Sequence, residues 1–163
     1  MPETRLKKRI LHRPDDLLEL VADVERYPRF IDLISALRIK NQKEVDGVEV
    51  FEAEATVSYK FISEKFISLV SVDRANRIIT VKKSERGGAL KTLENKWVFN
   101  ELSDGSTMVD FFVEVTLKAF PLNMLLKDKF EKIGKEIMAV FEHKAGLAYE
   151  KVGDPELVFD TVS

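Results

Sequence analysis

The sequence predicts an α+β domain with a curved antiparallel sheet of about seven strands, two short helices after the first strand, and one long C-terminal helix. This prediction rests on the spacing of apolar residues, which changes twice along the chain. Residues 14–24 and those after Pro121 have helical spacing, whereas apolar and polar residues alternate between 37 and 117. The 163 residues fit one domain, placed at residues 1–152, with a C-terminal tail at 153–163.

The N-terminal part has the pattern of a strand followed by a helix. Residues 5–12 alternate loosely in polarity, which predicts the first strand. Pro14 suits the first turn of a helix, and Asp15 and Asp16 lie beside the positive end of its dipole. The apolar face of this helix is formed by Leu17, Leu18, Val21 and Val24.

A kink is expected at Tyr27-Pro28. The residue before a proline is disfavoured in the helical region. We therefore expect the first helix to end at Tyr27 and a second, shorter helix to run from Pro28 to about Ser35. A wide, twisted sheet curls, so the pair of helices is expected to close one end of it, with Tyr27, Phe30 and Ile31 directed inward.

Four turn signals divide the middle of the chain into strands. Asp46-Gly47 and Asp104-Gly105 are strong hairpin turns, and segments 73–77 and 85–88 are weaker ones. One face of the strand after the first turn carries Ala53, Ala55, Val57, Tyr59 and Phe61. We expect a bulge near residues 48–51, where the alternation changes parity. The resulting meander is expected to have one wet and one dry face.

One long amphipathic helix is expected after Pro121. Its apolar stripe consists of Leu122, Leu126, Phe130, Ile133, Ile137, Phe141 and Ala148. A helix of this length, about 40 Å, crosses the whole sheet but covers only a strip of it. The rest of the concave face is then filled by packed side chains or left as a cavity. The tail that follows has no period, and Leu157, Val158 and Phe159 are its candidates for a packed contact.

Composition excludes several classes of function. The formal net charge of −2 argues against nucleic acid as a direct partner, because phosphate binding needs a concentrated positive field. The chain has no cysteine, so disulfides and thiolate metal sites are excluded. His12 and His143 lie in no metal or catalytic motif, and we expect no metal site, catalytic residue or enzyme activity. We recognise no secretory signal and no membrane span.

Five segments, in order over nearly the whole chain, carry a resemblance to a known family. They read "LVADVERYPRFI", "SEKFISLVSVD", "GGALKTLENKWVF", "VDFFVEVTLKAFPL" and "VFEHKAGLAYE". Together they resemble the START-like superfamily with its helix-grip fold, and within it the polyketide cyclase/dehydrase branch that contains the coenzyme Q-binding proteins and the ribosome-association toxins. The family usually has Gly-Pro-Phe at Gly88-Ala89-Leu90, arginine at Lys144, and an apolar, proline-containing segment at "IDLISAL".

The resemblance implies a lipid-like ligand in a hydrophobic tunnel. On the residues alone, the large apolar side chains fit an ordinary core; the resemblance implies that they line the tunnel. The residues in question are Tyr27, Phe30, Tyr59, Trp97, Phe99, Phe111, Val113, Phe130, Ile133, Ile137 and Phe141. For the coenzyme Q-binding proteins the implied ligand is a polyprenyl quinone, most simply ubiquinone, kept available for the respiratory chain. The quinone would be a ligand, and no cofactor is implied.

The junction between the last strand and the long helix predicts an entrance. Its apolar residues are too dense for one helix face, and lysines flank them, a composition that suits a membrane surface or the mouth for a lipid. The alternative is that the junction folds back and buries them. We assign the entrance and membrane contact to Gly87, Gly88, Leu90, Phe120, Leu122, Leu125 and Lys127. The expected partners are therefore the inner-membrane surface or respiratory complexes.

Two other functions stay open at this point. The toxin relatives imply a protein that binds the ribosome, although the chain has no basic stripe for direct RNA contact. A polyketide cyclase or dehydratase would need an acid–base pair inside the cavity, for which Glu64, Asp110 and Glu114 are the carboxylates to check. The expected location is the bacterial cytoplasm, peripheral to the inner membrane; a mature organellar form would have the same sequence features.

Overall fold

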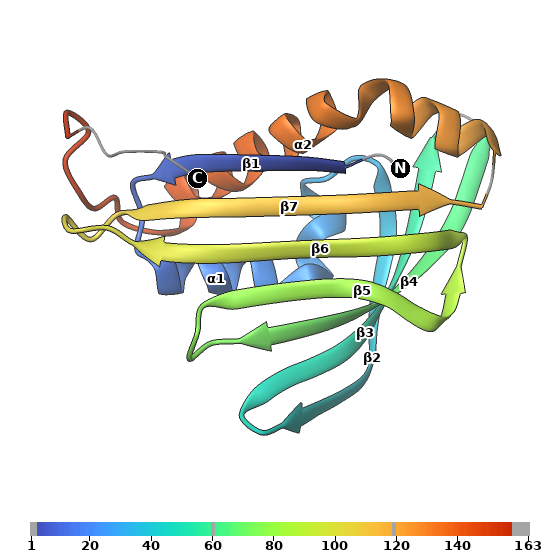
Figure 1. The fold of residues 1–163 in the computed structure, drawn as a ribbon, viewed down its shortest axis with the longest axis horizontal. Coiled ribbons are helices and arrows are strands. Elements are labelled where there is room, and N and C mark those ends of the chain that lie inside the picture. The colour runs from blue at the N-terminus through green and yellow to red at the C-terminus, as the bar shows by residue number, and fades with distance from the viewer. Residues whose placement is uncertain (1–2, 60, 119, 158–163) are drawn as a thin grey trace.

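The structure is a computed structural model that describes residues 3–59, 61–118 and 120–157. One antiparallel sheet of seven strands has the spatial order β1-β7-β6-β5-β4-β3-β2 (Figure 1). The strands are β1 (Glu3–Ile10), β2 (Ile34–Val45), β3 (Val48–Tyr59), β4 (Ile62–Asp73), β5 (Ile78–Gly88), β6 (Leu90–Glu101) and β7 (Thr107–Leu117). The predicted antiparallel meander is confirmed. The first strand, β1, pairs with β7 at the edge of the sheet.

Three helical segments accompany the sheet. They are α1 (Pro14–Ala22), the 3-10 helix η1 (Val24–Arg29) and α2 (Phe120–Ala148). In Figure 1, β2, β3 and β4 turn away from the plane of β1, β7 and β6, and α2 runs along the β1 edge. The helices lie on the concave side, so the predicted helix-grip architecture is confirmed.

The kink between the first two helices lies earlier than predicted. The α-helix ends at Ala22, because Asp23 leaves the helical region with φ −82° and ψ 67°. Tyr27 and Pro28 then lie inside η1, not at the boundary between two helices. The Tyr27 hydroxyl donates a hydrogen bond to the Val21 carbonyl, which α1 leaves without an intrahelical donor at its end. This side-chain bond ties η1 to α1, a contact that backbone preferences alone do not specify.

Residues with a left-handed φ angle form two of the hairpin turns. Asp46 (φ 52°) and Gly47 (φ 81°) form the β2–β3 turn, and Gly105 (φ 86°) lies in the β6–β7 turn, both as predicted. The bulge lies on β2 rather than β3: the pairing passes from Lys40 opposite Glu52 to Lys43 opposite Val50. Two β2 residues therefore oppose Phe51 alone, and Asn41 adopts φ 55° there.

Gly88 marks a close approach between β5 and β4. Its φ is +63°, and a Cβ on it would lie 2.2 Å from the Lys65 carbonyl oxygen. The following amide, of Ala89, donates to that same carbonyl at 2.8 Å, and the Ala89 carbonyl accepts from Lys118 at 2.8 Å. The double glycine predicted as a turn thus belongs to β5 and brings β4, β6 and the start of α2 together.

The long helix α2 packs its middle and C-terminal parts against the sheet. Lys129 has non-helical angles (φ −118°, ψ 15°), so the helix bends there. Beyond the bend, Phe130, Met138, Phe141 and Ala145 are buried. Gly134 lets the helix come close to β1, since a Cβ on it would lie 3.3 Å from the Thr4 methyl group. Among the described residues, no helix has the length and hydropathy needed to cross a membrane.

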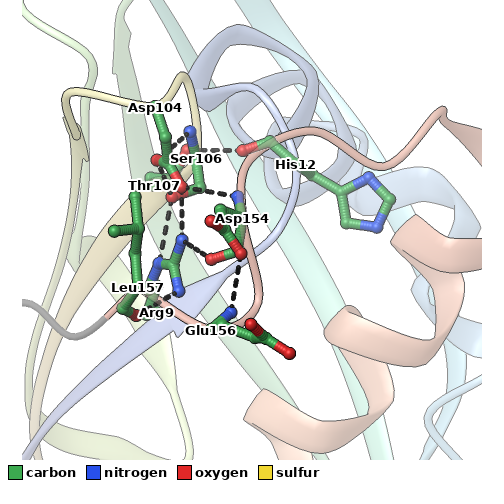
Figure 2. Close-up of polar contacts among 8 residues, drawn as sticks. All are labelled: Arg9, His12, Asp104, Ser106, Thr107, Asp154, Glu156 and Leu157. Carbon is green, nitrogen blue, oxygen red and sulfur yellow. Dashed lines mark hydrogen bonds and ion pairs between the residues drawn. The ribbon is translucent and has the colours of Figure 1, made fainter.

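The segment after α2 is bonded to the sheet as far as Leu157 (Figure 2). Arg9 on β1 donates to the carbonyls of Asp154 (2.7 Å) and Leu157 (3.0 Å) and forms an ion pair with Asp104. Asp104 also accepts from the Asp154 amide at 2.8 Å. Hydrogen bonds to Ser106 and to Asp154, together with Arg9, hold the pKa of Asp104 well below its usual range. We call residues 150–157 the C-terminal strap; Val158 and Phe159 lie outside the described residues.

Candidate functional site

A cavity of about 330 Å³ lies between the concave face of the sheet and α2. Eight of the residues predicted for a tunnel line it: Tyr27, Trp97, Phe111, Val113, Phe130, Ile133, Ile137 and Phe141. Its volume falls at the lower end of the range for small-molecule sites, about 300–1,000 Å³, which are mostly apolar with a few placed polar groups. The concave space left open in the sequence prediction is therefore partly hollow.

Small residues on β3 explain why space remains. Ala53, Ala55 and Val57 share the inward parity of this strand and line the cavity, where larger side chains would fill it. On the opposite side, one helix supplies the cover, with Phe130, Ile133 and Ile137 among the lining residues. A narrow helix over a wide, alanine-bearing sheet cannot close the interior completely.

Aromatic rings close the end of the cavity near η1. Trp97 contacts Phe111 and Phe141 edge to face, with ring centroids 4.6 and 5.4 Å apart. Phe141 also meets Tyr27 at 5.4 Å and Phe30 at 5.5 Å. Such pairs add about 0.5–1.5 kcal/mol beyond the area they bury. The 3-10 helix therefore joins α2 and β6 through one aromatic cluster, in agreement with the predicted inward direction of Tyr27.

The polar groups on the described cavity wall are uncharged. They are Tyr27, Ser68 and Asn95, and no Asp, Glu, His, Lys or Arg side chain is among the described lining residues. Burial, with a smaller contribution from Asp23, raises the pKa of Tyr27 above its usual value, so its hydroxyl stays protonated. The wall can therefore pack against an apolar molecule and form a few neutral hydrogen bonds with it. Its described residues offer no charged acid–base pair.

Two residues predicted for the tunnel, Phe30 and Phe99, are not among its described lining residues. Phe30 packs on Tyr27 and Phe141 and faces a separate hollow beside Lys144, whose ammonium lies 5.6 Å from its ring centroid. Phe99 is buried and stacks on Trp97, with centroids 6.1 Å apart. The side chain of Tyr59 lies outside the described residues. Phe30 and Phe99 thus support lining residues from behind.

The residues predicted for the entrance separate into four groups. Gly87 and Gly88 form the end of β5, where that strand bends against β4. Leu90 is buried and lines the cavity itself, in a cluster with Leu117. Lys127 is exposed on α2 and borders a surface groove. Phe120, Leu122 and Leu125 belong to the first turns of α2, and their side chains lie outside the described residues.

An exposed apolar and basic surface lies at this end of the molecule. Phe61, predicted to share the dry face of β3, instead lies in the β3–β4 turn with its side chain fully exposed. Met124 on α2 is 44% exposed. The backbone bonds at Ala89 bring this β4 end and the start of α2 together (Figure 1). We call this surface the basic end; it comprises Phe61, Lys65, Lys118, Met124, Lys127 and Lys129, with the acidic Glu64 and Asp128 next to these lysines.

Two of the three carboxylates singled out in the sequence lie on the outer face of the sheet. Asp110 and Glu114 have the outward parity of β7, and Asp110 approaches Arg5 at 4.0 Å. Glu64 lies opposite Val57, on the same face of the sheet as the cavity, but it is not among the described lining residues and borders a separate shallow hollow with Lys118. On the outer face of β3, hydrogen bonds from Ser84 and Asn41 lower the pKa of Glu52. Asp110, Glu114 and Glu52 therefore belong to the outer face of the sheet and do not reach the cavity.

The two histidines border the same surface hollow but form no metal site. His12 is 2% exposed, and its Nδ1 lies 3.1 Å from the Glu150 carbonyl oxygen. His143 is exposed on α2. Within the described part of the chain, no group of three His, Cys, Asp or Glu side chains has the arrangement of a metal site. His12 acts as a structural contact for the strap.

Sequence reasoning missed Ser68, Asn95 and the alanines of β3 as lining residues. The signal for Asn95 was present, since it shares strand parity with Leu93 and Trp97. A polar residue in an apolar row looks like an interruption of the pattern unless a cavity is already known.

Comparison with known proteins agrees with the geometry. The family model described as "Polyketide cyclase / dehydrase and lipid transport" matches residues 10–142. The chain is 25% identical to the ribosome association toxin RatA of Rickettsia prowazekii over 135 residues, which cover 82% of this chain and 89% of that protein. It is also 25% identical to the mitochondrial coenzyme Q-binding protein COQ10 homolog B of Xenopus laevis over 138 residues, 83% of this chain and 54% of that protein.

Solved structures share the architecture. The 18 kDa protein CC1736 of Caulobacter crescentus is 32% identical and superimposes with a TM-score of 0.73, covering 90% of this chain and 97% of that one. A START superfamily protein from Mycobacterium smegmatis gives a TM-score of 0.72 at 17% identity, with 89% and 97% covered. The second likeness bears on the fold alone.

Proposed function

Because this chain belongs to the polyketide cyclase/dehydrase and lipid transport family, we propose that it binds a hydrophobic, lipid-like molecule in its interior cavity and carries it without transforming it. The observation that carries this proposal is the apolar cavity of about 330 Å³ between the sheet and α2, with no charged group on its described wall. The proposed ligand is a ubiquinone-type quinone, supported by the likeness to a coenzyme Q-binding protein.

The binding energy would come from burial of the ligand's apolar part. Each buried methylene contributes about 0.8 kcal/mol, and the loss of translational freedom and of ligand flexibility opposes this gain. The rings of Trp97, Phe111 and Phe141 offer flat apolar surfaces to a planar head group. Micromolar affinity corresponds to a net gain of about 8 kcal/mol, so the buried head group and the buried part of the chain together must exceed this figure by the cost of association.

The partner surface that we propose is an anionic membrane. At the basic end, Phe61 and Met124 are exposed beside Lys118, Lys127 and Lys129. Apolar groups next to lysines suit the interface of a bilayer with anionic lipids. A protein that docks there through its basic end can exchange ligand with the bilayer of the inner membrane and with respiratory complexes in it. The proposed location is thus cytoplasmic and peripheral to the inner membrane.

Trp97 allows a direct test of ligand binding, because it is the chain's single tryptophan and it lines the cavity. Titration with a short-chain ubiquinone should quench its fluorescence with a saturable, micromolar curve. Ala55→Leu places extra carbon atoms in the cavity and should weaken binding about tenfold. Ala36→Leu, on the exposed face of β2, makes the same substitution without entering the cavity and should bind as the wild type does.

Two results would contradict the carrier function. One is quenching that is linear in quinone and equal in both leucine variants, which indicates collision rather than binding. The other is an organic extract of the protein, purified without detergent from its native host, that contains no stoichiometric lipid by mass spectrometry. A stoichiometric quinone in the extract would identify the ligand.

Ribosome association is the second candidate, favoured by the likeness to the RatA protein over 82% of this chain. The net charge of −2 disfavours direct RNA contact, so this function would act through ribosomal proteins. Sedimentation of ribosomal subunits with and without the protein separates the two proposals: a lower fraction of assembled ribosomes supports the second. A cyclase or dehydratase is disfavoured, because the described cavity wall lacks a charged acid–base pair.

A further inference from the structure

Asn95 is the most polar side chain on the described cavity wall. It lies on β6 with the same parity as Leu93 and Trp97, so its amide faces the interior among apolar neighbours. An amide in apolar surroundings is costly unless its donors and acceptors are satisfied. An alternating strand could bury an apolar residue at this position, which makes the amide a feature that needs an explanation.

Two hydrogen bonds fix the orientation of this amide. Its Nδ2 donates to the Phe112 carbonyl at 2.8 Å, and its Oδ1 accepts from the Trp97 Nε1–H at 3.0 Å. A carbonyl can only accept and an indole N–H can only donate. Exchange of the amide oxygen and nitrogen would therefore break both bonds. The polar group is held in one orientation by β7 on one side and by the aromatic cluster on the other.

Half of the hydrogen-bonding capacity of the amide remains. A side-chain amide has two N–H donors and two acceptor lone pairs, and the contacts with Phe112 and Trp97 use one of each. No other described residue is hydrogen-bonded to the side-chain amide of Asn95. The second N–H and the second lone pair are thus available to a molecule in the cavity, without any rotation of the side chain.

We propose that Asn95 recognises the polar head of the ligand, so that the cavity selects apolar molecules carrying a carbonyl or hydroxyl group. This inference rests on the proposed lipid-binding function and defines its ligand class. The free N–H donates to a carbonyl oxygen, and the free lone pair accepts from a hydroxyl. One residue can therefore hold both a quinone and the corresponding hydroquinone, whereas a hydrocarbon of the same shape forms no hydrogen bond with it.

Two ligands with the same decyl chain on a six-membered ring, one with oxygen substituents and one without, test this assignment. Decylubiquinone and decylbenzene carry the same chain, and calorimetry or equilibrium dialysis gives the affinity of each. Asn95→Leu keeps a similar volume and removes the amide; it should weaken decylubiquinone binding about tenfold, the loss expected for an unmatched buried carbonyl, and leave decylbenzene binding within about twofold. Asn100→Leu removes an amide on the same strand that also donates to a β7 carbonyl, that of Met108, but lies outside the cavity lining; it should change neither affinity by more than about twofold.

A second test uses the wild-type protein, so it does not require that Asn95→Leu folds. The side-chain amide protons of Asn95 give their own NMR signals, and these should shift on addition of decylubiquinone and stay in place with decylbenzene. Equal weakening of both ligands in Asn95→Leu, or bound quinone with unmoved Asn95 signals, would overturn the assignment alone. Failure of the wild type to bind either ligand would overturn the lipid-binding function together with it.

Discussion

Gly88 illustrates how a single residue allows the close approach of β5 to β4. A side chain there would meet the Lys65 carbonyl oxygen, and the backbone has a left-handed φ of +63°. Gly47 has a similar left-handed angle, φ +81°, but open space around it. The two glycines therefore separate the cost of the backbone angle from the cost of the steric clash.

Alanine substitution at both glycines tests this distinction. Gly47→Ala should lower the free energy of unfolding by about 1–2 kcal/mol, the cost of a left-handed angle for a residue with a Cβ. Gly88→Ala should lower it by at least about 2 kcal/mol more, since β5 must move away from β4. Urea unfolding followed by circular dichroism measures both. Equal losses would show that β5 can move away from β4 at little cost.

Parity in the strands predicted most of the aromatic wall, because alternation is a local property that the sequence displays directly. Trp97, Phe111 and Val113 were assigned to the interior in this way, and they line the cavity. Phe61 was assigned to the same dry face and is fully exposed, because the strand ends before it and a turn follows. Parity holds within a strand and says nothing of where the strand stops.

At the scale of elements, the C-terminal strap depends on charged contacts that link distant segments. Arg9 on β1 and Asp104 in the β6–β7 turn hold the backbone of Asp154 and Leu157 (Figure 2). The folded-state pKa of Asp104 is lowered. A carboxyl group with a lowered folded pKa stabilises the fold above its unfolded pKa, about 3.9 for aspartate, and loses this contribution as the pH falls through the folded value.

The strap should therefore stay attached from neutral pH down to about pH 4 and detach only at lower pH. Asp104→Asn should loosen it at all pH values, because the ion pair with Arg9 is lost. Hydrogen exchange at the amides of Val152 and Asp154 reports this directly. Asp46→Asn, in the opposite hairpin, should leave that exchange unchanged. Fast exchange of both amides in the wild type at pH 7 would contradict an attached strap.

The types and order of the elements could be predicted, whereas the joint between α1 and η1 could not. Periodicity in 14–24 and after Pro121 marked the helices, and turn dipeptides marked the hairpins. The joint depends on the Tyr27 hydroxyl reaching the Val21 carbonyl, a tertiary contact within a short loop. The strap likewise depends on Arg9, nearly 150 residues away from Leu157 in the chain. Such tertiary contacts do not change the spacing of apolar residues, so they cannot be predicted from the sequence pattern.

At the scale of the whole molecule, the size of the cavity limits how much ligand it can enclose. A water molecule occupies about 30 Å³ in the liquid, so about 330 Å³ holds roughly eleven groups of that size. A substituted quinone ring and little more of its chain would occupy this space. The remainder of a long prenyl chain would have to lie along the protein surface or in the membrane.

Quinone affinity should consequently rise with chain length only up to about one or two prenyl units and then level off. The rise reflects about 0.8 kcal/mol per buried methylene, and the plateau reflects carbon atoms that stay outside. Titration of Trp97 fluorescence with quinones of increasing chain length gives the curve. A continued rise over many units would indicate that α2 moves outward and enlarges the cavity.

In the proposed membrane contact, the basic end is the surface that faces the bilayer. Phe61→Ser should weaken binding to vesicles rich in anionic lipid by about tenfold, since burial of a phenylalanine contributes about 1.5–3 kcal/mol. Val45→Ser removes another exposed apolar residue, in the β2–β3 hairpin, and should have little effect. Sedimentation with vesicles measures both, and binding should fall as salt is added. Equal binding of the two variants would mean that another surface meets the membrane.

The pairing of β1 with β7 also governs when the chain can fold during its synthesis. Leu6 faces Phe111 across these strands, so the first strand stays without its neighbour until more than one hundred residues have followed it. Such distant pairing slows folding, because a long loop must close before the contact forms. The helix α2 is synthesised later still. Until it packs on the sheet, the aromatic side chains of the concave face are exposed to solvent and prone to aggregation. The same architecture that leaves room for a ligand thus keeps the apolar interior of the nascent chain exposed, and open to aggregation, until the last steps of its synthesis.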